Sequence, residues 1–168
     1  LKSEVLDPAG RAARMALREA GLSTVGDVRV VRAFFLEGVL SPTALETAVR
    51  EVLADPVLDL AAVDQDLPPA GAVHGPGHDH VVTVTRKAGV TDPEAETARG
   101  ALAAIGVAVL HVHAAREYRI RASASPEAVL AAAKRAHGND VIEDVVRVLQ
   151  GRSPLYLAWL DEDSPIPP

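Results

Sequence analysis

The sequence predicts an α+β fold of two tandem modules, each with helices packed on one face of a mostly antiparallel sheet, forming a pseudo-dimer. Three observations support this prediction: a repeat spaced by 84 to 85 residues, helical spacing of apolar residues, and period-two alternation in strands. A lone sheet of this size would expose its edges and one apolar face. Pairing of the two copies is therefore expected.

The first helix of each copy is predicted to begin at an Asp-Pro pair. Asp7-Pro8 and Asp92-Pro93 place an N-cap before a proline in the first helical turn. Gly21 and Gly106 follow where a helix end favours a residue at positive φ. The predicted apolar face has the same spacing in both copies: Ala13, Ala16, Leu17 and Ala20, and then Ala98, Ala101, Leu102 and Ile105.

An extended segment follows in each copy, at 28–36 and 112–120, as a long strand or a hairpin. In the second copy, buried positions are predicted to alternate with solvated ones, namely Tyr118, Ile120 and Ala122 against Glu117, Arg119 and Arg121. A further strand at 81–85 opens the second copy, and its counterpart in the first copy is predicted to be truncated.

A second helix is predicted to begin at Ser41-Pro42 and at Ser125-Pro126. Each copy should then close with a turn and a short strand, at 57–59 and at 141–143. Each copy therefore contributes strand, helix, long strand, helix and strand.

The domain organisation follows from the repeat. Module 1 spans residues 1–64, and module 2 spans residues 80–149. Residues 65–79 are rich in Pro and Gly, which is typical of a linker. Residues 150–168 form a C-terminal extension without a counterpart in the first copy.

Composition excludes several classes of function. The chain has no cysteine, so it has no disulfide, no thiolate metal site and no thiolate nucleophile. Its net charge of −6 without a basic block argues against binding to nucleic acid or to a membrane surface. No phosphate-binding glycine motif is present, and the longest apolar run, 101–110, is too short to span a bilayer. A cytoplasmic location is expected.

Several short motifs resemble those of the PurS family. Residues 1–10 resemble its LKxxVLDPxG turn, residues 27–30 its DVRxG strand, and residues 53–59 its LxNPVIED closing segment. In the second copy, 139–144 resembles the same closing segment. The sequence departs from the family at 94–96, where Glu-Ala-Glu replaces the glycine step.

The resemblance implies a non-catalytic structural component of phosphoribosylformylglycinamidine (FGAM) synthase in de novo purine biosynthesis. Such a component brings the ATP-dependent synthetase PurL and the glutaminase PurQ together for ammonia transfer. It binds no cofactor and no metal itself, although the complex uses ATP and Mg. The duplication is similar to the N-terminal region of large PurL proteins, as an internal pseudo-dimer that can associate further.

Arg32 and Arg116 are the candidate contacts for a partner or an anion. The family has Gly-Lys where this sequence has Val31-Arg32 and Ala115-Arg116. The positive charge is therefore retained, and the glycine is replaced. The competing interpretation is ordinary ion pairing on the surface, with Glu37 or Glu117 as the partner. No catalytic residue is predicted.

The histidines are not predicted to bind a metal. His74, His78 and His80, with Asp79, are taken as polar linker residues, because their spacing matches no common zinc pattern. His111 and His113 share one strand face and are predicted to be solvated.

A tandem ACT-like module that binds an amino acid is the alternative function. Such sensors favour a glycine-containing turn before the first helix, and Gly10 is a weak match. The second copy has no glycine near Asp92, which disfavours a symmetric ligand site.

Overall fold

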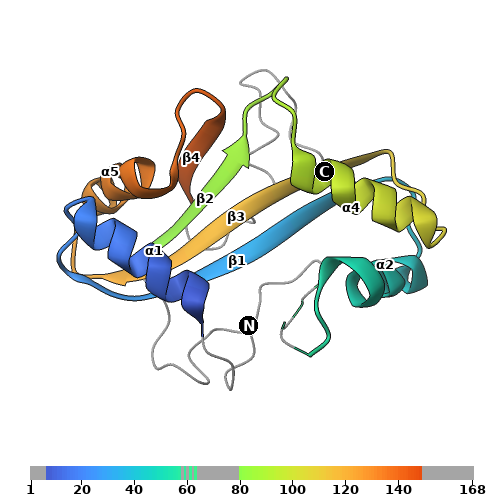
Figure 1. Ribbon diagram of the computed structural model, residues 1–168, viewed down its shortest axis with the longest axis horizontal. Helices are drawn as coiled ribbons and strands as arrows, with labels where there is room; N and C mark the ends of the chain where they lie inside the picture. The colour runs from blue at the N-terminus through green and yellow to red at the C-terminus, as the bar shows by residue number, and fades with distance from the viewer. Residues whose placement is uncertain (1–6, 58, 60, 62, 64–79, 149–168) are drawn as a thin grey trace.

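The computed structural model describes residues 7–57, 59, 61, 63 and 80–148. It confirms the α+β fold, with helices covering a single antiparallel sheet (Figure 1). The elements in chain order are α1 (Pro8–Glu19), β1 (Val25–Glu37), α2 (Pro42–Ala48), the π-helical turn η1 (Val49–Leu53), β2 (His80–Arg86), α4 (Pro93–Ala104), β3 (His111–Ala122), α5 (Pro126–His137) and β4 (Glu143–Val148).

The sheet joins the two copies through their long strands. Its order is β1-β3-β2-β4, and every neighbouring pair is antiparallel. β1 and β3 are single strands of 13 and 12 residues, so neither forms a hairpin. Their register places Arg32 opposite Arg116, which are equivalent positions of the repeat. A pseudo-twofold axis therefore passes between these two residues.

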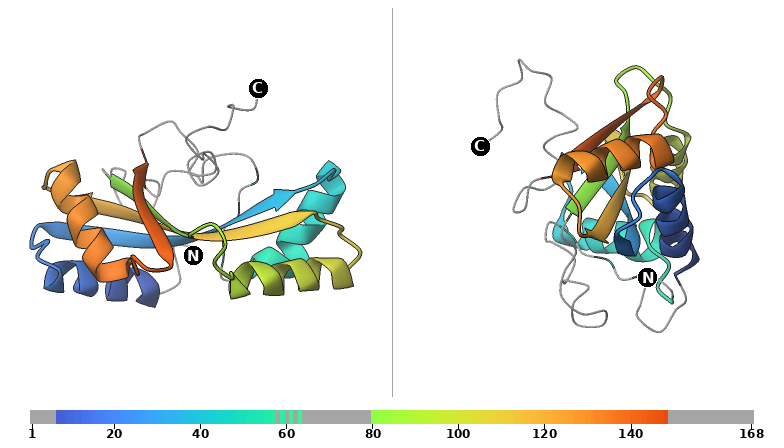
Figure 2. Two further views of the ribbon diagram at one scale, coloured as in Figure 1. Left: turned by 90° about the horizontal axis from the view of Figure 1, so that it is seen from above. Right: turned by 90° about the vertical axis from the view of Figure 1, so that its left-hand side faces the viewer.

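The helices lie in two groups at opposite ends of the sheet (Figure 1). α1 packs beside α5 at one end, and α4 packs beside η1 at the other. Even-numbered residues of β1 and β3 meet both groups, so the helices share one face of the sheet (Figure 2). Each group thus combines a helix of one copy with a helix of the other.

Both hydrophobic cores contain residues of both copies. The core under α1 and α5 includes Leu17 from the first copy with Ile120 and Val129 from the second, all fully buried. The core under α4 joins Ala48 of the first copy to Leu102 of the second. Neither copy therefore completes a core with its own residues.

Local signals fix the helix starts as predicted. The Asp7 carboxylate accepts a hydrogen bond from the Gly10 amide at 2.7 Å, and Asp92 accepts one from Ala95 at 3.1 Å. Ser41 and Ser125 cap α2 and α5 in the same way. The two helix-ending glycines also have the expected positive φ, +96° at Gly21 and +80° at Gly106.

The closing strands differ from the prediction. In the second copy the chain turns through Val141 and Ile142, and β4 begins only at Glu143. In the first copy Val57 lies in a turn and Asp59 lies outside any strand, while residue 58 is outside the described residues. The second copy therefore has its predicted closing strand, but the strand begins two residues later than predicted. Val57 and Asp59 of the first copy lie outside any strand, because side-chain hydrogen bonds fold both segments into turns.

One predicted solvated position is buried. Glu117 is only 5% exposed, because β3 is an inner strand and Glu117 lies between Val31 of β1 and Thr83 of β2. Within the described part of the chain, β1 has a pairing partner on one side only. The predicted linker (65–79) and the predicted C-terminal extension (150–168) lie outside the described residues.

Candidate functional site

A hydrogen-bonded turn anchors Arg116 in the second copy. The Asn139 side chain accepts from the Val141 amide at 3.2 Å, and the Glu143 amide donates to the Asn139 carbonyl at 2.7 Å. The Glu143 carboxylate accepts in return from the Asn139 amide at 3.1 Å. This turn presents Glu143 to Arg116 at 2.8 Å and to Arg86 at 3.4 Å.

The first copy repeats the arrangement. The Asp55 side chain accepts from the Val57 amide at 2.7 Å, and the Asp59 carboxylate accepts from the Asp55 amide at 3.0 Å. Asp59 also binds Arg32, with 3.0 Å between the guanidinium and carboxylate atoms. Each copy therefore ties its closing turn to its own long strand through an arginine on the pseudo-twofold axis.

Arg32 and Arg116 both form ion pairs, as the competing interpretation predicted, but the predicted partners Glu37 and Glu117 are wrong. Glu37 and Glu117 lie at odd-numbered strand positions, on the face opposite to the two arginines. Glu117 instead accepts from Arg119 on that opposite face at 2.6 Å. The true partners lie 27 residues after each arginine, and this repeated spacing is a signal that the sequence did contain.

Arg32 and Arg116, at the centre of the sheet, can bind an anionic group, but neither side chain is a nucleophile or a general acid or base. Arg32 and Arg116 remain 53% and 43% exposed, and each guanidinium has more N–H donors than its single carboxylate uses. Their mutual repulsion across the strands is offset by Asp59 and Glu143. A contact with a partner carboxylate or phosphate at this position stays a prediction.

A stacked aromatic pair lies next to this centre on β3 and α5. The rings of Tyr118 and His137 are 4.1 Å apart and nearly parallel, at 7°. Burial, together with the smaller effect of the charge of Arg116, lowers the pKa of His137 to about 4. Burial also raises the pKa of Tyr118. Sequence patterns did not indicate this pair, because strand and helix bring it together from distant positions.

The other described histidines, His80, His111 and His113, belong to no cluster of potential metal ligands. His111 and His113 are exposed at the start of β3, as predicted. His80 is not a linker residue: it is the first residue of β2, 7% exposed, and lies opposite Ile120. No group of three or more potential metal ligands occurs among the described residues. The remaining residues of that predicted set, 74, 78 and 79, lie outside them.

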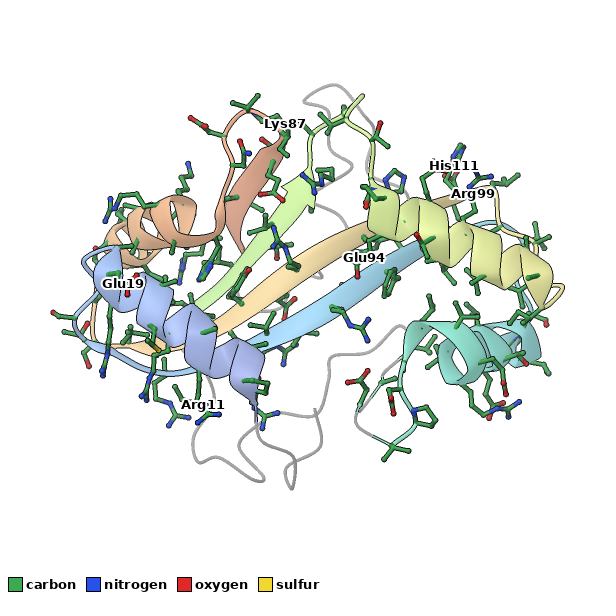
Figure 3. The ribbon with its side chains drawn as sticks, viewed as in Figure 1. Arg11, Glu19, Lys87, Glu94, Arg99 and His111 are labelled. Carbon is green, nitrogen blue, oxygen red and sulfur yellow. The ribbon has the colours of Figure 1, made fainter. Side chains whose placement is uncertain are left out.

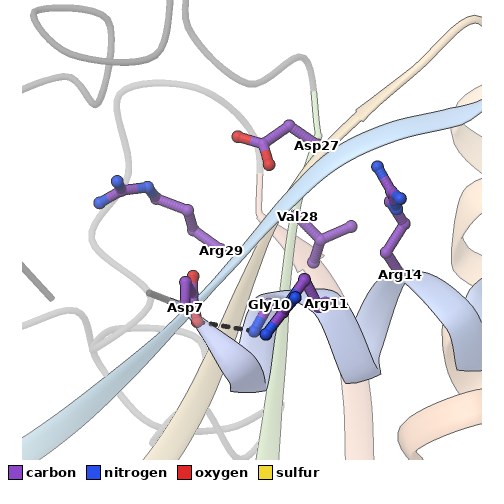
Figure 4. Close-up of a pocket in the computed structure, with 7 residues that line it drawn as sticks. All are labelled: Asp7, Gly10, Arg11, Arg14, Asp27, Val28 and Arg29. Carbon is purple, nitrogen blue, oxygen red and sulfur yellow. Dashed lines mark hydrogen bonds between the residues drawn. The ribbon is translucent and has the colours of Figure 1, made fainter. Parts of the chain in front are cut away.

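A small pocket of about 130 Å³ lies where α1 meets β1 (Figure 4). Its lining is rich in charge and consists of Asp7, Gly10, Arg11, Arg14, Asp27, Val28 and Arg29. Asp7 is committed to its helix cap, as the dashed line in Figure 4 shows. In the described part of the chain, the side chains of Arg11 and Arg14 have no hydrogen-bond or ion-pair partner.

No helix among the described residues is long and apolar enough to cross a membrane. A search of curated proteins found no match. The sequence model of the PurS family, described as phosphoribosylformylglycinamidine (FGAM) synthase, matches residues 1–64 and 79–150. These two segments are the two copies of the repeat and make up most of the chain. The chain therefore belongs to the PurS family, as a tandem duplication, and has its role in FGAM synthase and purine biosynthesis.

Proposed function

We propose that this chain is the structural component of FGAM synthase that holds the ATP-dependent synthetase PurL and the glutaminase PurQ together for ammonia transfer. The observation that carries the proposal is the double match to the PurS family, at residues 1–64 and 79–150. A family member with two copies in one chain has its pairing partner built in.

The architecture supports a scaffold. Because both cores combine residues of both copies, the helix groups at the two ends of the sheet are held in a fixed relation. Two separate proteins that bind to such a platform would be fixed relative to each other. Fixed geometry between a glutaminase and a synthetase is what direct passage of ammonia requires.

The chemistry is assigned to the partners. Glutamine hydrolysis in this pathway needs a thiolate nucleophile, and this sequence contains no cysteine. ATP and Mg are proposed to bind to the synthetase. The chain would then raise the rate of amide transfer without taking part in bond formation.

The test compares two nitrogen sources. Synthetase and glutaminase from the same source, with Mg, ADP and glutamine, are mixed with this chain and analysed by size-exclusion chromatography with light scattering. We expect a ternary complex, and we expect glutamine-dependent FGAM formation to require the chain while ammonia-dependent formation does not.

The control is a variant that cannot fold. Leu17→Asp with Leu102→Asp places a charge in each core, where both leucines are fully buried, so it should lose assembly and glutamine-dependent activity together. Separate elution of the wild-type chain, with activity indifferent to it, would contradict the scaffold. A screen of amino-acid ligands would then test the ACT-like alternative.

A further inference from the structure

Three arginines and a methionine form one stripe on α1, in which Arg11, Met15 and Arg18 are exposed and Arg14 is half-buried. Arg11, Arg14 and Arg18 follow each other at i, i+3 and i+7, so they lie on one side of the helix with Met15 among them. Met15 is the single methionine of the chain and is 61% exposed. In the view of Figure 3, Arg11 projects from the side of α1 away from α5. These four residues are called the α1 arginine stripe.

The stripe is absent from the equivalent helix of the second copy. Positions 11, 14, 15 and 18 correspond to Glu96, Arg99, Gly100 and Ala103 of α4. There, Glu96 and Arg99 form an ion pair at 3.3 Å. The duplication thus shows that this helix folds with a self-compensating pair, which α1 does not have.

The arginines of the stripe lower the intrinsic stability of the helix α1. Arg11 lies near the N-terminal end of α1, where the helix dipole repels cations, and α1 has no acidic residue in its first turn. Arg11 and Arg14 are like charges three residues apart, an arrangement that destabilises a helix. Neither side chain has a bonded partner among the described residues, whereas Arg18 donates to the Val25 carbonyl at 3.4 Å.

The helices at the two ends of the sheet carry net charges of opposite sign. The helices α1 and α5 contain five Lys or Arg residues against two Glu. The helices at the other end, α2, η1 and α4, contain four Glu against two Arg. The helices of the two ends, which are equivalent by the repeat, therefore differ in charge, and the charge at the α1 end is the one that attracts an acidic partner.

We propose that the α1 arginine stripe docks a carboxylate-rich surface of a protein partner, with Met15 packing at its centre. Arg and Met are enriched at protein interfaces, and seven residues of helix span about 10 Å, which suits a protein surface better than a single phosphate. The inference rests on the proposed function, because the partner is the synthetase or the glutaminase.

The decisive variant is Arg11→Glu. It recreates on α1 the Glu–Arg pair of α4 and places an acid near the helix N-terminus, so the free energy of unfolding should not fall. Binding to immobilised synthetase and glutaminase should weaken about tenfold or more. Wild-type affinity should drop when NaCl is raised from about 50 to about 300 mM, and the variant should respond less. Arg11→Lys, which keeps the charge, should bind nearly as wild type does.

The matched control is Arg99→Glu, which makes the same Arg-to-Glu charge change on α4, at the position equivalent to Arg14, and should leave binding unchanged. Equal affinity and salt dependence of wild type and Arg11→Glu would overturn the docking inference and leave the scaffold standing. Failure of the wild-type chain to bind either protein would overturn both. Stabilisation of the wild type by inorganic phosphate, with protein binding insensitive to Arg11→Glu, would assign the stripe to a small anion and overturn the protein partner.

Discussion

Gly10 of α1 approaches β1 so closely that a Cβ atom at this position would lie 2.2 Å from the carbonyl oxygen of Val28. The same atom would lie 2.5 Å from the capping carboxylate of Asp7. A side chain at residue 10 would therefore disturb the helix cap and the helix–sheet contact at once. In α4 the equivalent position is Ala95, which is 4% exposed, so that helix accommodates a Cβ.

Gly10→Ala should lower the free energy of unfolding by about 1 to 3 kcal/mol, because α1 must move away from the sheet. Gly100→Ala is the matched control, since a Cβ there meets nothing within 4 Å. It should raise stability by about 0.5 to 1 kcal/mol through the better helix propensity of alanine. Urea unfolding followed by circular dichroism measures both. Equal effects of the two substitutions would show that the close approach is not real.

Glu143 should contribute more to stability than its counterpart Asp59. The side chain of Glu143 is 9% exposed and binds two arginines, whereas that of Asp59 is 22% exposed and binds Arg32. Glu143→Gln should cost about 1 to 3 kcal/mol, because Arg116 and Arg86 lose a shielded acceptor charge. Asp59→Asn should cost less than about 1 kcal/mol, as exposed pairs do.

A double-mutant cycle of Glu143→Gln with Arg116→Ala, measured by urea unfolding, checks the assignment. The cost of Glu143→Gln should shrink when Arg116 is already absent. Additive costs, or a larger loss for Asp59→Asn, would contradict the paired geometry.

Sequence reasoning identified the features that depend on neighbours in the chain. The helix starts at Pro8 and Pro126 follow from caps formed within three residues, so a local pattern contains all that is needed. The ion pair of Arg116 with Glu143 depends instead on where β4 begins, and a turn built from side-chain hydrogen bonds set that point. Period-two alternation gave the face of Glu117 but not its burial, because burial depends on the neighbouring strands.

The sequence also did not predict that helices of one copy pack against helices of the other copy. A repeat shows that two equivalent units exist, yet it does not tell which helix packs against which. Long-range pairing of β1 with β3 decides that α1 meets α5 of the other copy. The same pairing puts the two predicted site arginines opposite each other.

Because the cores are shared, neither copy should fold as a monomer on its own. Residues 1–79 and 80–168, expressed separately, should each be unfolded or form a dimer that reproduces the pseudo-twofold pairing. Mixing them should restore the sheet, since Leu17 and Val129 then meet again in one core. Analytical ultracentrifugation with circular dichroism checks this, and a folded monomer of either half would contradict the shared cores.

His137 should make the protein sensitive to mild acid. Burial against Tyr118 lowers the pKa of His137 to about 4, below the ordinary value of 6.5, so the folded protein binds this proton less readily than the unfolded chain. The contribution of the neutral ring to stability is complete above the unfolded pKa. It is lost at up to about 1.4 kcal/mol per pH unit as the pH falls from about 6.5 to about 4.

His137→Phe separates this effect from the titration of carboxylates, which is common to both proteins. Phe keeps a ring to stack on Tyr118 and removes Nε2, a buried atom that has no hydrogen-bond partner. At pH 7 the variant should be at least as stable as the wild type. At about pH 4.5 the free energy of unfolding of the variant should exceed that of the wild type by a further ~2 kcal/mol. The reason is that unfolding of the wild type alone is favoured by protonation of the His137 ring. Urea unfolding at both pH values measures the difference, and a difference that does not change with pH would contradict the lowered pKa of His137.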